Sequence, residues 1–362
     1  MPEPESNQHD QHAGHELEAG VLARVREWID LLPWLRLLRT LRIAGSPSMI
    51  LIAMFTLALW APVYLWILDR DGPARWSLET PFSAVDPAPA RAASSIETVR
   101  FFIASLTANI QGDRGGLTRP LCSLLWTMIV WSCGSLVFVR QGGLLTAGRS
   151  MVNLKEVARS AASRSPAAWA AGVVPIACIA MLATPIWAAG WVASLVPESP
   201  VAQLPLAFVA AVMAIPCGIL GFGAIVAIPL AWSAIANERD PDVLDALSRG
   251  YEYLYRRPLQ LVMYGVVAVV LLTIATALIS GVVATAQQIV LVALDWTSAP
   301  AMTHNLTQQI LTLIPIATAF ALAWGLVGGV YLLIRYDAGG QQVEDLWVPP
   351  LAPRDPVPTL PT

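Results

Sequence analysis

The sequence predicts an all-α protein: a polytopic membrane helix bundle with six transmembrane helices and amphipathic interfacial helices before spans 1, 3 and 5. Of its 362 residues, 56% are hydrophobic and only 13% are charged, whereas an ordinary soluble domain has about 25% charged residues. Apolar stretches long enough to cross a bilayer recur along the chain, and basic residues gather in alternate loops. The net charge of -3 gives no reason to expect nucleic acid as a partner.

The first 20 residues are polar and acidic, and we expect them to form a disordered cytoplasmic tail. A secretory signal peptide begins with basic residues and then turns apolar, so this start predicts that the first span stays in the membrane. His9, His12 and His15 would share one side of a helix, but Gly14 disfavours a helix there. Whether this tail binds a metal is left open, and we assign no metal site.

Residues 21–46 are expected to form an amphipathic helix on the cytoplasmic surface of the membrane. Leucines are interleaved there with basic residues, which is typical of a helix that lies in the interface plane. The expected contacts with anionic lipid headgroups are made by Trp34, Arg36, Arg39 and Arg42. The interleaved leucines and the adjoining span disfavour a nucleic-acid partner.

Six stretches have the roughly 20 apolar residues that a bilayer core of about 30 Å requires. They lie at about 47–68, 121–139, 167–195, 204–234, 259–291 and 308–334. They predict a six-span transmembrane domain at 47–340, with an outer loop at 69–120 and a Pro-rich cytoplasmic tail at 341–362. None of the six stretches contains Asp, Glu, Lys, Arg or His.

The basic residues predict the orientation of the spans. With the N-terminus in the cytoplasm, 16 of the 22 Lys and Arg residues fall on the cytoplasmic side, and the other six lie in the 69–120 loop. Short cytoplasmic loops are rich in Lys and Arg. We therefore expect a multi-pass protein of the cytoplasmic membrane with both termini in the cytoplasm.

The segment "DALSRGYEYLYRRP" at 245–258 shows how the chain is expected to enter the fifth span. Asp240 would cap a helix that begins at Pro241. Its apolar stripe would consist of Leu244, Leu247, Tyr251 and Leu254. The residues expected to contact lipid headgroups are Arg249, Arg256 and Arg257. The residues expected to contact a partner are Tyr251, Tyr253 and Tyr255.

Similar basic, helix-patterned segments precede spans 1 and 3, at 32–47 and 153–166, and the second contributes Arg164 as a further interface anchor. Each of the three segments ends at a proline just before an outward span. We interpret this as three units of interfacial helix, span out and span back. The pattern fits both an internal repeat, as in many transporters, and three hairpins of a plain scaffold.

Small residues in the spans predict where helices pack closely. The candidates are Gly218, Gly221, Gly325 and Gly329, and the last two form a G-x-x-x-G pattern. Such spacing lets two helix backbones approach each other inside a membrane. We expect helix packing at these positions, and no ligand path.

The residues that catalysis or ion transport would need are missing from the spans. Ionisable groups inside a membrane mark proton relays and ion sites, so their absence disfavours an ion-coupled pump. The single lysine, Lys155, does not lie in a P-loop pattern, so any ATPase would be a separate subunit. The four cysteines show no metal-ligand spacing. We expect no enzymatic activity and no cofactor.

The 245–258 segment, followed by an apolar span and "YLLIRYDAGG", resembles uncharacterised multi-pass membrane proteins of bacteria, of planctomycetes in particular. The resemblance covers mainly residues 235–340 and implies no activity. The loop at 235–257 also resembles the coupling loop of ABC-importer permeases, in which an E-A-A-x-x-x-G run contacts the ATPase. Here Gly250 follows Asp245 by five residues where that pattern has six, and Leu247 replaces the second alanine.

These observations predict an integral membrane scaffold, assembly factor or accessory subunit without catalytic activity. The expected partners are the lipid bilayer with its anionic headgroups, and other membrane proteins or a cytoplasmic protein at 235–257. The alternative is a permease subunit of a transporter that a separate ATPase energises. The sequence leaves the substrate, the partner and the oligomeric state open.

Overall fold

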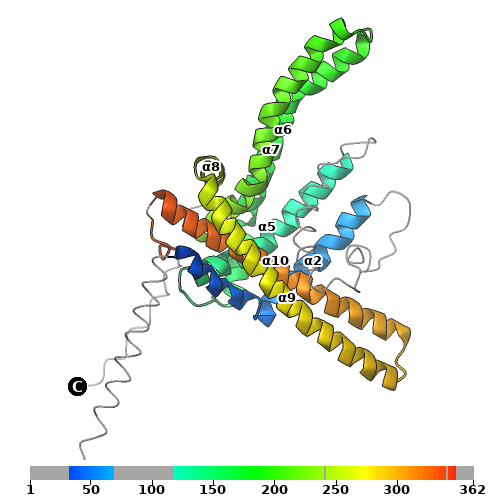
Figure 1. The fold of residues 1–362 in the computed structure, drawn as a ribbon, viewed down its shortest axis with the longest axis vertical. Helices are drawn as coiled ribbons and strands as arrows, with labels where there is room; N and C mark the ends of the chain where they lie inside the picture. The colour runs from blue at the N-terminus through cyan, green and yellow to red at the C-terminus, as the bar shows by residue number, and fades with distance from the viewer. Residues whose placement is uncertain (1–31, 69–117, 240–241, 340, 348–362) are drawn as a thin grey trace, which may run out of the picture.

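The structure is a computed structural model and describes residues 32–68, 118–239, 242–339 and 341–347 (Figure 1). Of these residues, 88% are helical and none forms a strand, which confirms the all-α prediction. The elements are η1 (Pro33–Ile43), α2 (Pro47–Leu68), α5 (Thr118–Thr146), α6 (Leu154–Leu195), α7 (Pro200–Asn237), α8 (Val243–Arg256), α9 (Pro258–Trp296) and α10 (Ala301–Gly339). The tail expected at 1–20 and nearly all of the loop expected at 69–120 lie outside the described residues, as does most of the Pro-rich tail.

The long apolar helices are those of a multi-pass membrane protein. Five of them, α5, α6, α7, α9 and α10, are each long and apolar enough to cross a membrane. A sixth span is counted only if η1 and α2, whose described parts meet at an angle of 76°, are taken together. The described residues therefore contain five or six candidate spans, where the sequence predicted six.

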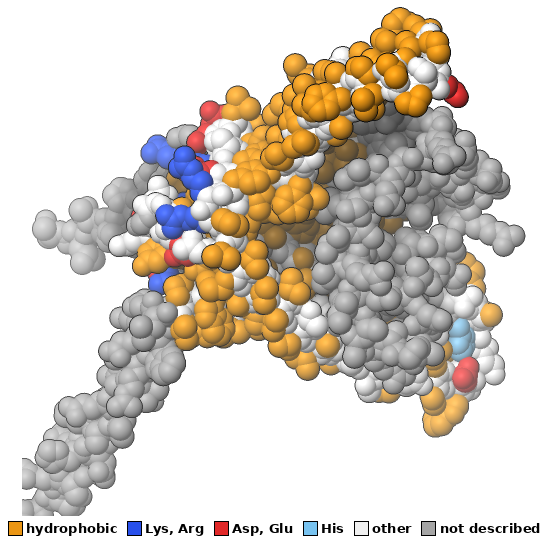
Figure 2. Space-filling view, turned by 45° about the horizontal axis from the view of Figure 1, so that its top comes forward, with side chains coloured by type: hydrophobic (Ala, Val, Ile, Leu, Met, Phe, Trp, Pro, Cys, Tyr) orange, Lys and Arg blue, Asp and Glu red, His pale blue; other side chains and the backbone are white. Residues whose placement is uncertain are grey.

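Two helical hairpins, α6–α7 and α9–α10, diverge from one another. In Figure 1 the α6–α7 hairpin and the α9–α10 hairpin point in different directions, with α5 and α2 between them. The most apolar stretch of α5 is 89% buried, whereas those of α6 and α7 are 22% buried and that of α9 is 28% buried. Hydrophobic side chains cover the outside of the hairpins (Figure 2). Protein therefore surrounds α5, whereas the hairpins present apolar surfaces that lipid can cover.

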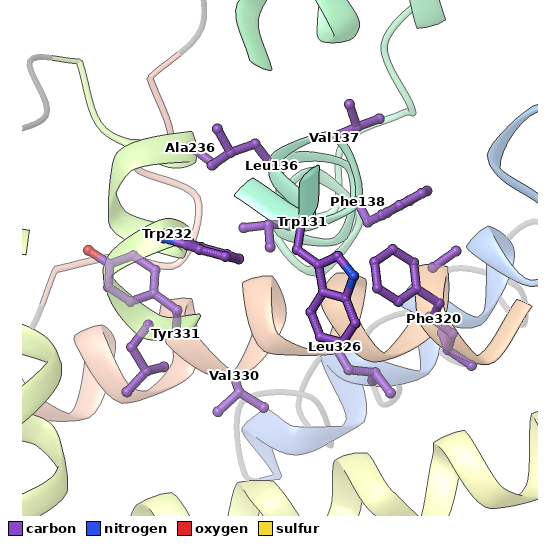
Figure 3. Packing of buried hydrophobic residues seen from close by; sticks show 14 of the residues in the cluster. Trp131, Leu136, Val137, Phe138, Trp232, Ala236, Phe320, Leu326, Val330 and Tyr331 are labelled. Carbon is purple, nitrogen blue, oxygen red and sulfur yellow. The ribbon is translucent and has the colours of Figure 1, made fainter. Parts of the chain in front are cut away.

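Aromatic side chains fill the space around the centre of the bundle (Figure 3). Trp131 of α5 lies between Trp60 of α2 and Phe320 of α10, with ring centroids 5.3 Å away in both cases. Trp232 of α7 stacks on Trp324 of α10 at 5.2 Å. Offset and edge-to-face aromatic pairs of this kind contribute about 0.5–1.5 kcal/mol beyond the burial of their area. The aromatic groups therefore join α2, α5 and α7 to α10.

Two of these indoles also bond helix to helix. The Trp60 Nε1 donates a hydrogen bond to the Thr127 hydroxyl of α5 at 2.9 Å, and the Trp232 Nε1 donates to the Ala168 carbonyl of α6 at 2.7 Å. Hydrocarbon offers no acceptor for an indole N–H, so a partner inside the protein is needed. The bonds pair α2 with α5 and α7 with α6.

Helices α5 and α10 touch backbone to backbone at glycine residues. A Cβ added to Gly142 would overlap the carbonyl oxygen of Gly325, and one added to Gly328 would overlap the carbonyl oxygen of Val139. No side chain fits between the two helices there. This close contact holds together the C-terminal halves of α5 and α10, which face the cytoplasm in the predicted orientation.

The same face of α10 also receives η1. The Ile43 side chain occupies the place of a Cβ on Gly325, and a Cβ on Gly329 would lie 2.6 Å from the Leu37 side chain. Leu37 and Ile43 are both fully buried. Gly325 and Gly329 thus lie at close contacts, as their spacing predicted.

The other two glycines that the sequence singled out do not lie at such contacts. Nothing lies within 4 Å of a Cβ added to Gly218, and one added to Gly221 would meet only the Ile179 side chain at 3.7 Å, an ordinary van der Waals distance. Both belong to α7, which packs against α6. The expectation of close packing at Gly218 and Gly221 is therefore corrected.

The segment expected as an amphipathic helix at 21–46 is a 3-10 helix, η1, in its described part, and residues 21–31 lie outside the description. A 3-10 helix has three residues per turn, so side chains three apart form straight rows. One row consists of Arg36, Arg39 and Arg42, and the buried row consists of Leu37, Thr40 and Ile43. The three-residue spacing of the arginines matches this helix type, and η1 packs into the bundle along its buried row.

The separate interfacial helix expected before span 3 is instead the first part of α6, which continues through Pro166. A proline removes one backbone donor and leaves the carbonyl four residues earlier without its usual partner. Here the Ser165 hydroxyl donates a hydrogen bond to that carbonyl, of Ala162, at 3.0 Å. The freed carbonyl is therefore satisfied, and the helix has no need to break.

We expect Gly142→Ala to lower the free energy of unfolding by about 1–3 kcal/mol, the usual cost of overpacking. The new methyl group would press against the Gly325 backbone, which has no flexible side chain to move aside. Gly218→Ala is the matched control, because its methyl group would enter open space. Thermal unfolding of both variants in one detergent measures the difference, and equal melting temperatures would contradict the α5–α10 contact.

Candidate functional site

Away from the hairpin tips, the charged side chains of α6, α7, α9 and α10 gather at one end of the molecule (Figure 2). The uncharged stretches of α6, α7, α9 and α10 separate this end from the hairpin tips. Within the described residues, the only Asp, Glu, Lys, Arg or His side chains at the hairpin tips are those of Glu198, Asp295 and His304. The charged end is therefore the candidate functional site, and it faces the cytoplasm in the predicted orientation.

Five arginines at this end surround the C-terminal segment, residues 341–347. We call them the arginine cluster, and they are Arg36 of η1, Arg140 of α5, Arg149 after α5, Arg164 of α6 and Arg335 of α10. They come from separate elements, so only the tertiary structure brings them together. The segment is thereby fixed against η1, α5, α6 and α10.

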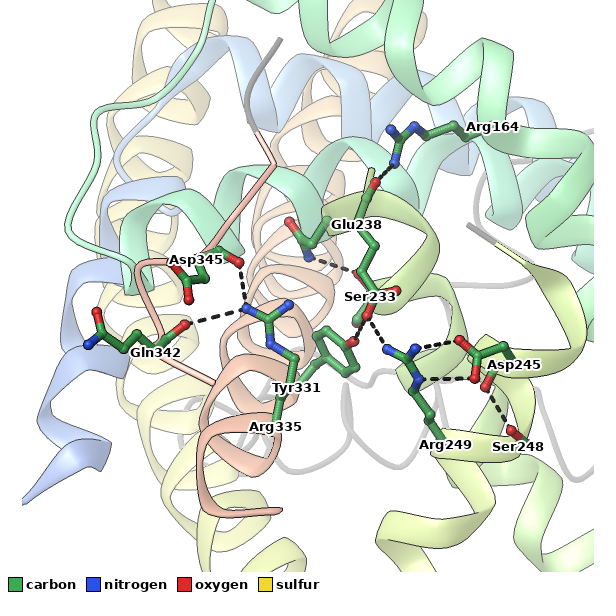
Figure 4. A network of polar contacts seen from close by, with 11 residues as sticks. Arg164, Ser233, Glu238, Asp245, Ser248, Arg249, Tyr331, Arg335, Gln342 and Asp345 are labelled. Carbon is green, nitrogen blue, oxygen red and sulfur yellow. Dashed lines mark hydrogen bonds and ion pairs between the residues drawn. The ribbon is translucent and has the colours of Figure 1, made fainter. Parts of the chain in front are cut away.

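Most contacts of the cluster with this segment are made to backbone carbonyl oxygens. Arg335 donates to the carbonyls of Asp345 at 2.6 Å and Gln342 at 3.5 Å (Figure 4). Arg149 donates to the carbonyl of Glu344 at 3.1 Å. Only Arg36 pairs with a carboxylate of the segment, that of Glu344.

Trp347 closes the segment against α5, α6 and α7. Its carbonyl accepts a hydrogen bond from Arg140, and its backbone N–H donates to the Asn237 carbonyl at 3.3 Å. The Arg164 guanidinium lies 5.0 Å from the centroid of the Trp347 ring, within the range of a cation–π contact. One residue thus contacts two arginines and the end of α7.

The C-terminal end of α7 is held by the same arginines. Asn237 is fully buried, and its Oδ1 accepts a hydrogen bond from Arg140 at 3.3 Å. Arg164 donates to the carbonyls of Ile235 at 2.5 Å and Glu238 at 2.7 Å. The last carbonyls of a helix lack partners within the helix and carry partial negative charge, which favours a cation there.

Glu238, directly after α7, ties α8 and α10 to this end (Figure 4). Its carboxylate accepts hydrogen bonds from Arg249 at 2.7 Å and from the Tyr331 hydroxyl at 2.5 Å. Arg249 also pairs with Asp245. Burial by itself would lower the pKa of Arg249, but Glu238 and Asp245 outweigh it and raise that pKa. Arg249 therefore keeps its charge in this network.

Two of the tyrosines predicted to contact a partner bond to α7 instead. The Tyr251 hydroxyl donates to the Leu220 carbonyl at 2.9 Å, and the Tyr255 hydroxyl donates to the Ile219 carbonyl at 2.6 Å. Burial, with a smaller effect of Tyr255, raises the pKa of Tyr251 to about 12. Tyr255 is 49% exposed and keeps a free face toward the surroundings.

The third tyrosine is inside the protein, which corrects the expectation for it. Tyr253 is buried, and its ring lies 6.3 Å from that of Tyr331. Burial also raises the pKa of Tyr253. A side chain in this position packs α8 against α10 and has no surface left for a partner.

Helix α8 begins at Val243, later than the predicted start at Pro241, and its buried face differs from the predicted apolar stripe. The Asp242 side chain accepts a hydrogen bond from the Leu244 N–H at 3.0 Å, so Asp242 is the N-cap, whereas residues 240–241 lie outside the description. Leu244, expected in the buried stripe, is 64% exposed. A Cβ on Gly250 would lie 2.6 Å from the Ala227 carbonyl oxygen. Because Gly250 has no side chain, α8 lies close to α7 at this residue. The buried face of α8 is therefore centred on Gly250 and leaves Leu244 exposed.

The residues expected as membrane anchors separate into two groups. In the first group, Arg36, Arg164 and Arg249 bond inside the protein, as described above. Trp34 is partly buried against the core, and Arg257 donates a hydrogen bond to the Asp337 carbonyl at 2.5 Å. The exposed group consists of Arg39, Arg42 and Arg256. Arg256 is paired with Glu252 at 2.8 Å, yet its side chain is 78% exposed. The exposed group is the one that can reach lipid headgroups.

The arrangement is suited to binding oxygen atoms. Guanidinium groups form fixed forks of N–H donors that match carbonyl, carboxylate and phosphate oxygens. In the described part of the chain, no three His, Cys, Asp or Glu side chains are placed to hold a metal ion, and the histidines at 9–15 lie outside it. Arg140, Arg149 and Arg335 entered the sequence analysis only among the basic residues of the cytoplasmic side, and Asn237 was not singled out, because no local signal marks these residues as neighbours.

Comparison with known proteins adds no assignment. No protein family, curated protein or solved structure matches the chain. The resemblance of 235–340 to multi-pass bacterial proteins therefore stays an expectation. The function has to be argued from the distribution of apolar surface and charge described above.

We expect the C-terminal segment to loosen as the pH falls below 4.5. Burial by itself would raise the pKa of Glu344, but hydrogen bonds from its own backbone N–H and from Arg36 hold that pKa below its ordinary value of 4.5. A carboxyl with a depressed pKa stabilises the folded state fully above its ordinary pKa, and this contribution is lost as the pH falls through the depressed value.

A fluorophore attached to a cysteine at the exposed position of Gln341 reports this change, in a chain without the four native cysteines. Glu344→Gln is the control, because the amide keeps the size of the side chain and does not titrate. We expect the pH-dependent step in the parent protein and a reduced or absent step in Glu344→Gln. The same step in both proteins would contradict the role of this carboxylate.

Proposed function

We propose that the protein is a multi-pass scaffold, assembly factor or accessory subunit of the bacterial cytoplasmic membrane, with no chemistry of its own. The observation that supports this most is the use of the charged side chains at the arginine-rich end. The described bonds of the arginine cluster and of Glu238 join η1, α5, α6, α7, α8, α10 and the C-terminal segment. Such bonds fix helices relative to one another, and this is what a rigid platform requires.

The two hairpins support the membrane part of the proposal. The apolar surfaces of α6, α7 and α9 are mostly uncovered by protein, and large apolar surfaces in water are unfavourable. The basic residues at the opposite end favour the cytoplasmic side of the membrane for that end, and for both termini. Lipid would then cover the hairpins while the platform meets the cytoplasm.

The exposed face of α8 is the surface that we propose for a protein partner. It consists of Leu244, Ser248, Glu252, Tyr255 and Arg256. Leu244 and Arg256 are 64% and 78% exposed, so the face combines an apolar group with a charged one. Helix α8 itself is tied to α7 by Arg249 and the tyrosines, so a partner would bind to a surface with a fixed position.

A permease subunit energised by a separate ATPase is the second candidate. Its support is the similarity of the 235–257 loop to a coupling loop, in which an E-A-A-x-x-x-G run contacts the ATPase and Gly250 stands for the glycine of that run. In this chain Gly250 is buried and packs against Ala227. The residue that carries the similarity thus serves the contact of α8 with α7, and this favours the scaffold.

We expect the Ser248→Cys variant to react with a membrane-impermeant maleimide only after the cell membrane is permeabilised. Ser248 is exposed on α8, on the side that the basic residues place in the cytoplasm. Met302→Cys is the matched control at the tip of the α9–α10 hairpin, where Met302 is 71% exposed. It should react in intact cells, and the opposite pattern for the two cysteines would overturn the orientation.

Crosslinking in living cells separates the two candidate functions. A photoreactive amino acid at Leu244 or Glu252 should form a discrete protein adduct, because both positions are exposed on α8, and Arg256→Glu should weaken that adduct. The same probe at Met302 serves as the control and should not yield this adduct. A partner without an ATPase domain supports the scaffold. An ATPase in the adduct, or lipid adducts alone, would contradict it.

A further inference from the structure

We propose that a recess between α5, α6 and α7 binds the phosphodiester group of an anionic phospholipid from the cytoplasmic leaflet. The proposal deepens the proposed function and depends on it for one point, the position of the arginine-rich end at the membrane surface. In this structure the C-terminal segment lies at the recess. The contacts of Arg140 and Arg164 carry the argument.

The recess combines two guanidinium groups with an apolar wall. With the C-terminal segment in place, its cavity volume is about 10 Å³, room for about one water molecule, and its polar lining consists of Arg140, Arg164 and Ser160. The apolar lining consists of Leu136, Val157, Ala161 and Ala236. A phospholipid has the same two parts side by side, a charged phosphodiester and an apolar glycerol ester and acyl region. A free phosphate ion would leave the apolar wall without a partner.

The charge of Arg140 is poorly compensated by the protein. Its side chain is only 8% exposed, and its hydrogen bonds in the described residues go to neutral oxygens, the Asn237 Oδ1 and the Trp347 carbonyl. A buried charge is costly unless an opposite charge pairs with it. Arg164 and Arg149 lie near enough to add repulsion, which Glu156 offsets only in part. A phosphodiester in the recess would supply the missing negative charge.

Trp347 contacts both arginines of the recess, so a lipid phosphodiester would replace these contacts. Its carbonyl accepts from Arg140 and its ring covers Arg164. Hydrogen bonds between charged groups are roughly twice as strong as neutral ones, so a phosphate oxygen can replace the carbonyl with a gain in binding energy. A further donor of the cluster, the buried Arg335 Nε, has no hydrogen-bond partner among the described residues.

The depth of the recess favours a lipid. Arg140 directly follows the uncharged stretch at 121–139, and Arg164 directly precedes the uncharged stretch that begins at 165. Arginines at the ends of apolar spans lie at the level of the headgroups. The recess therefore opens where phosphodiester groups of the leaflet are concentrated.

Native mass spectrometry of the full chain tests the proposal. The protein is purified in detergent and incubated with equal amounts of phosphatidylglycerol or phosphatidylcholine, and retained lipids are counted. We expect retention of phosphatidylglycerol to exceed that of phosphatidylcholine, and to fall about tenfold in Arg164→Gln, which loses one charge-assisted contact. Inorganic phosphate at the lipid concentration should not displace the lipid.

Two further variants make the test independent of folding defects. Trp347→Ala uncovers the recess and keeps both arginines, so it should retain several-fold more phosphatidylglycerol than the parent protein. Lys155→Gln removes an exposed charge from the same end of α6 but outside the recess, and it should behave like the parent. Equal retention of the two lipids, an equal loss in Lys155→Gln, displacement by inorganic phosphate, or no gain in Trp347→Ala would each overturn the proposal. Lipid retention in detergent does not depend on which side of the membrane the arginine-rich end faces. An error in the predicted topology is therefore detected separately, by the cysteine labelling at positions 248 and 302.

Discussion

The backbone contact between α5 and α10 is the constraint on which the rest of the structure depends. Glycines on both helices remove the side chains that would keep them apart, so the carbonyl of Gly325 lies where a side chain of residue 142 would be. Close backbone approach is a favourable way to associate helices in a membrane, where apolar side chains gain little from leaving lipid. Helix η1 then packs on the same glycines, and the aromatic groups around Trp131 and Phe320 fill the neighbouring space.

This contact also explains why the arginines meet. Arg140 lies two residues before Gly142, and Arg335 lies two to three turns beyond Gly325 and Gly328 on α10. With the glycines in register, both arginines are brought to the same end of the bundle. Desolvating a guanidinium is costly, and the helix C-terminus of α7 together with the C-terminal segment provides carbonyl oxygens that reduce this cost. The helix contact and the polar network therefore depend on each other.

The divergence of the hairpins gives the protein two kinds of surface. Most of the apolar surface of α6, α7 and α9 has no protein neighbour, whereas the charged end is densely bonded. A protein that only had to cross the membrane would not need a network that joins six helices at one end. Apolar hairpins together with a densely bonded polar end support the proposed component that presents a partner surface on α8 and a recess at the level of the lipid headgroups.

The sequence by itself determined the features that follow from local pattern. Hydropathy and length predicted a helical membrane protein, the distribution of basic residues predicted the orientation of its spans, and the G-x-x-x-G spacing predicted close contact at Gly325 and Gly329. The tertiary structure alone decided the 3-10 form of η1, the continuity of α6 through Pro166, the burial of Tyr253 and the grouping of the arginines. The physical reason is separation along the chain: Arg36 and Glu344 are 308 residues apart and Arg140 and Trp347 are 207 apart. No periodicity within one helix can reveal such partners, whereas periodicity is sufficient to predict which stretches avoid water.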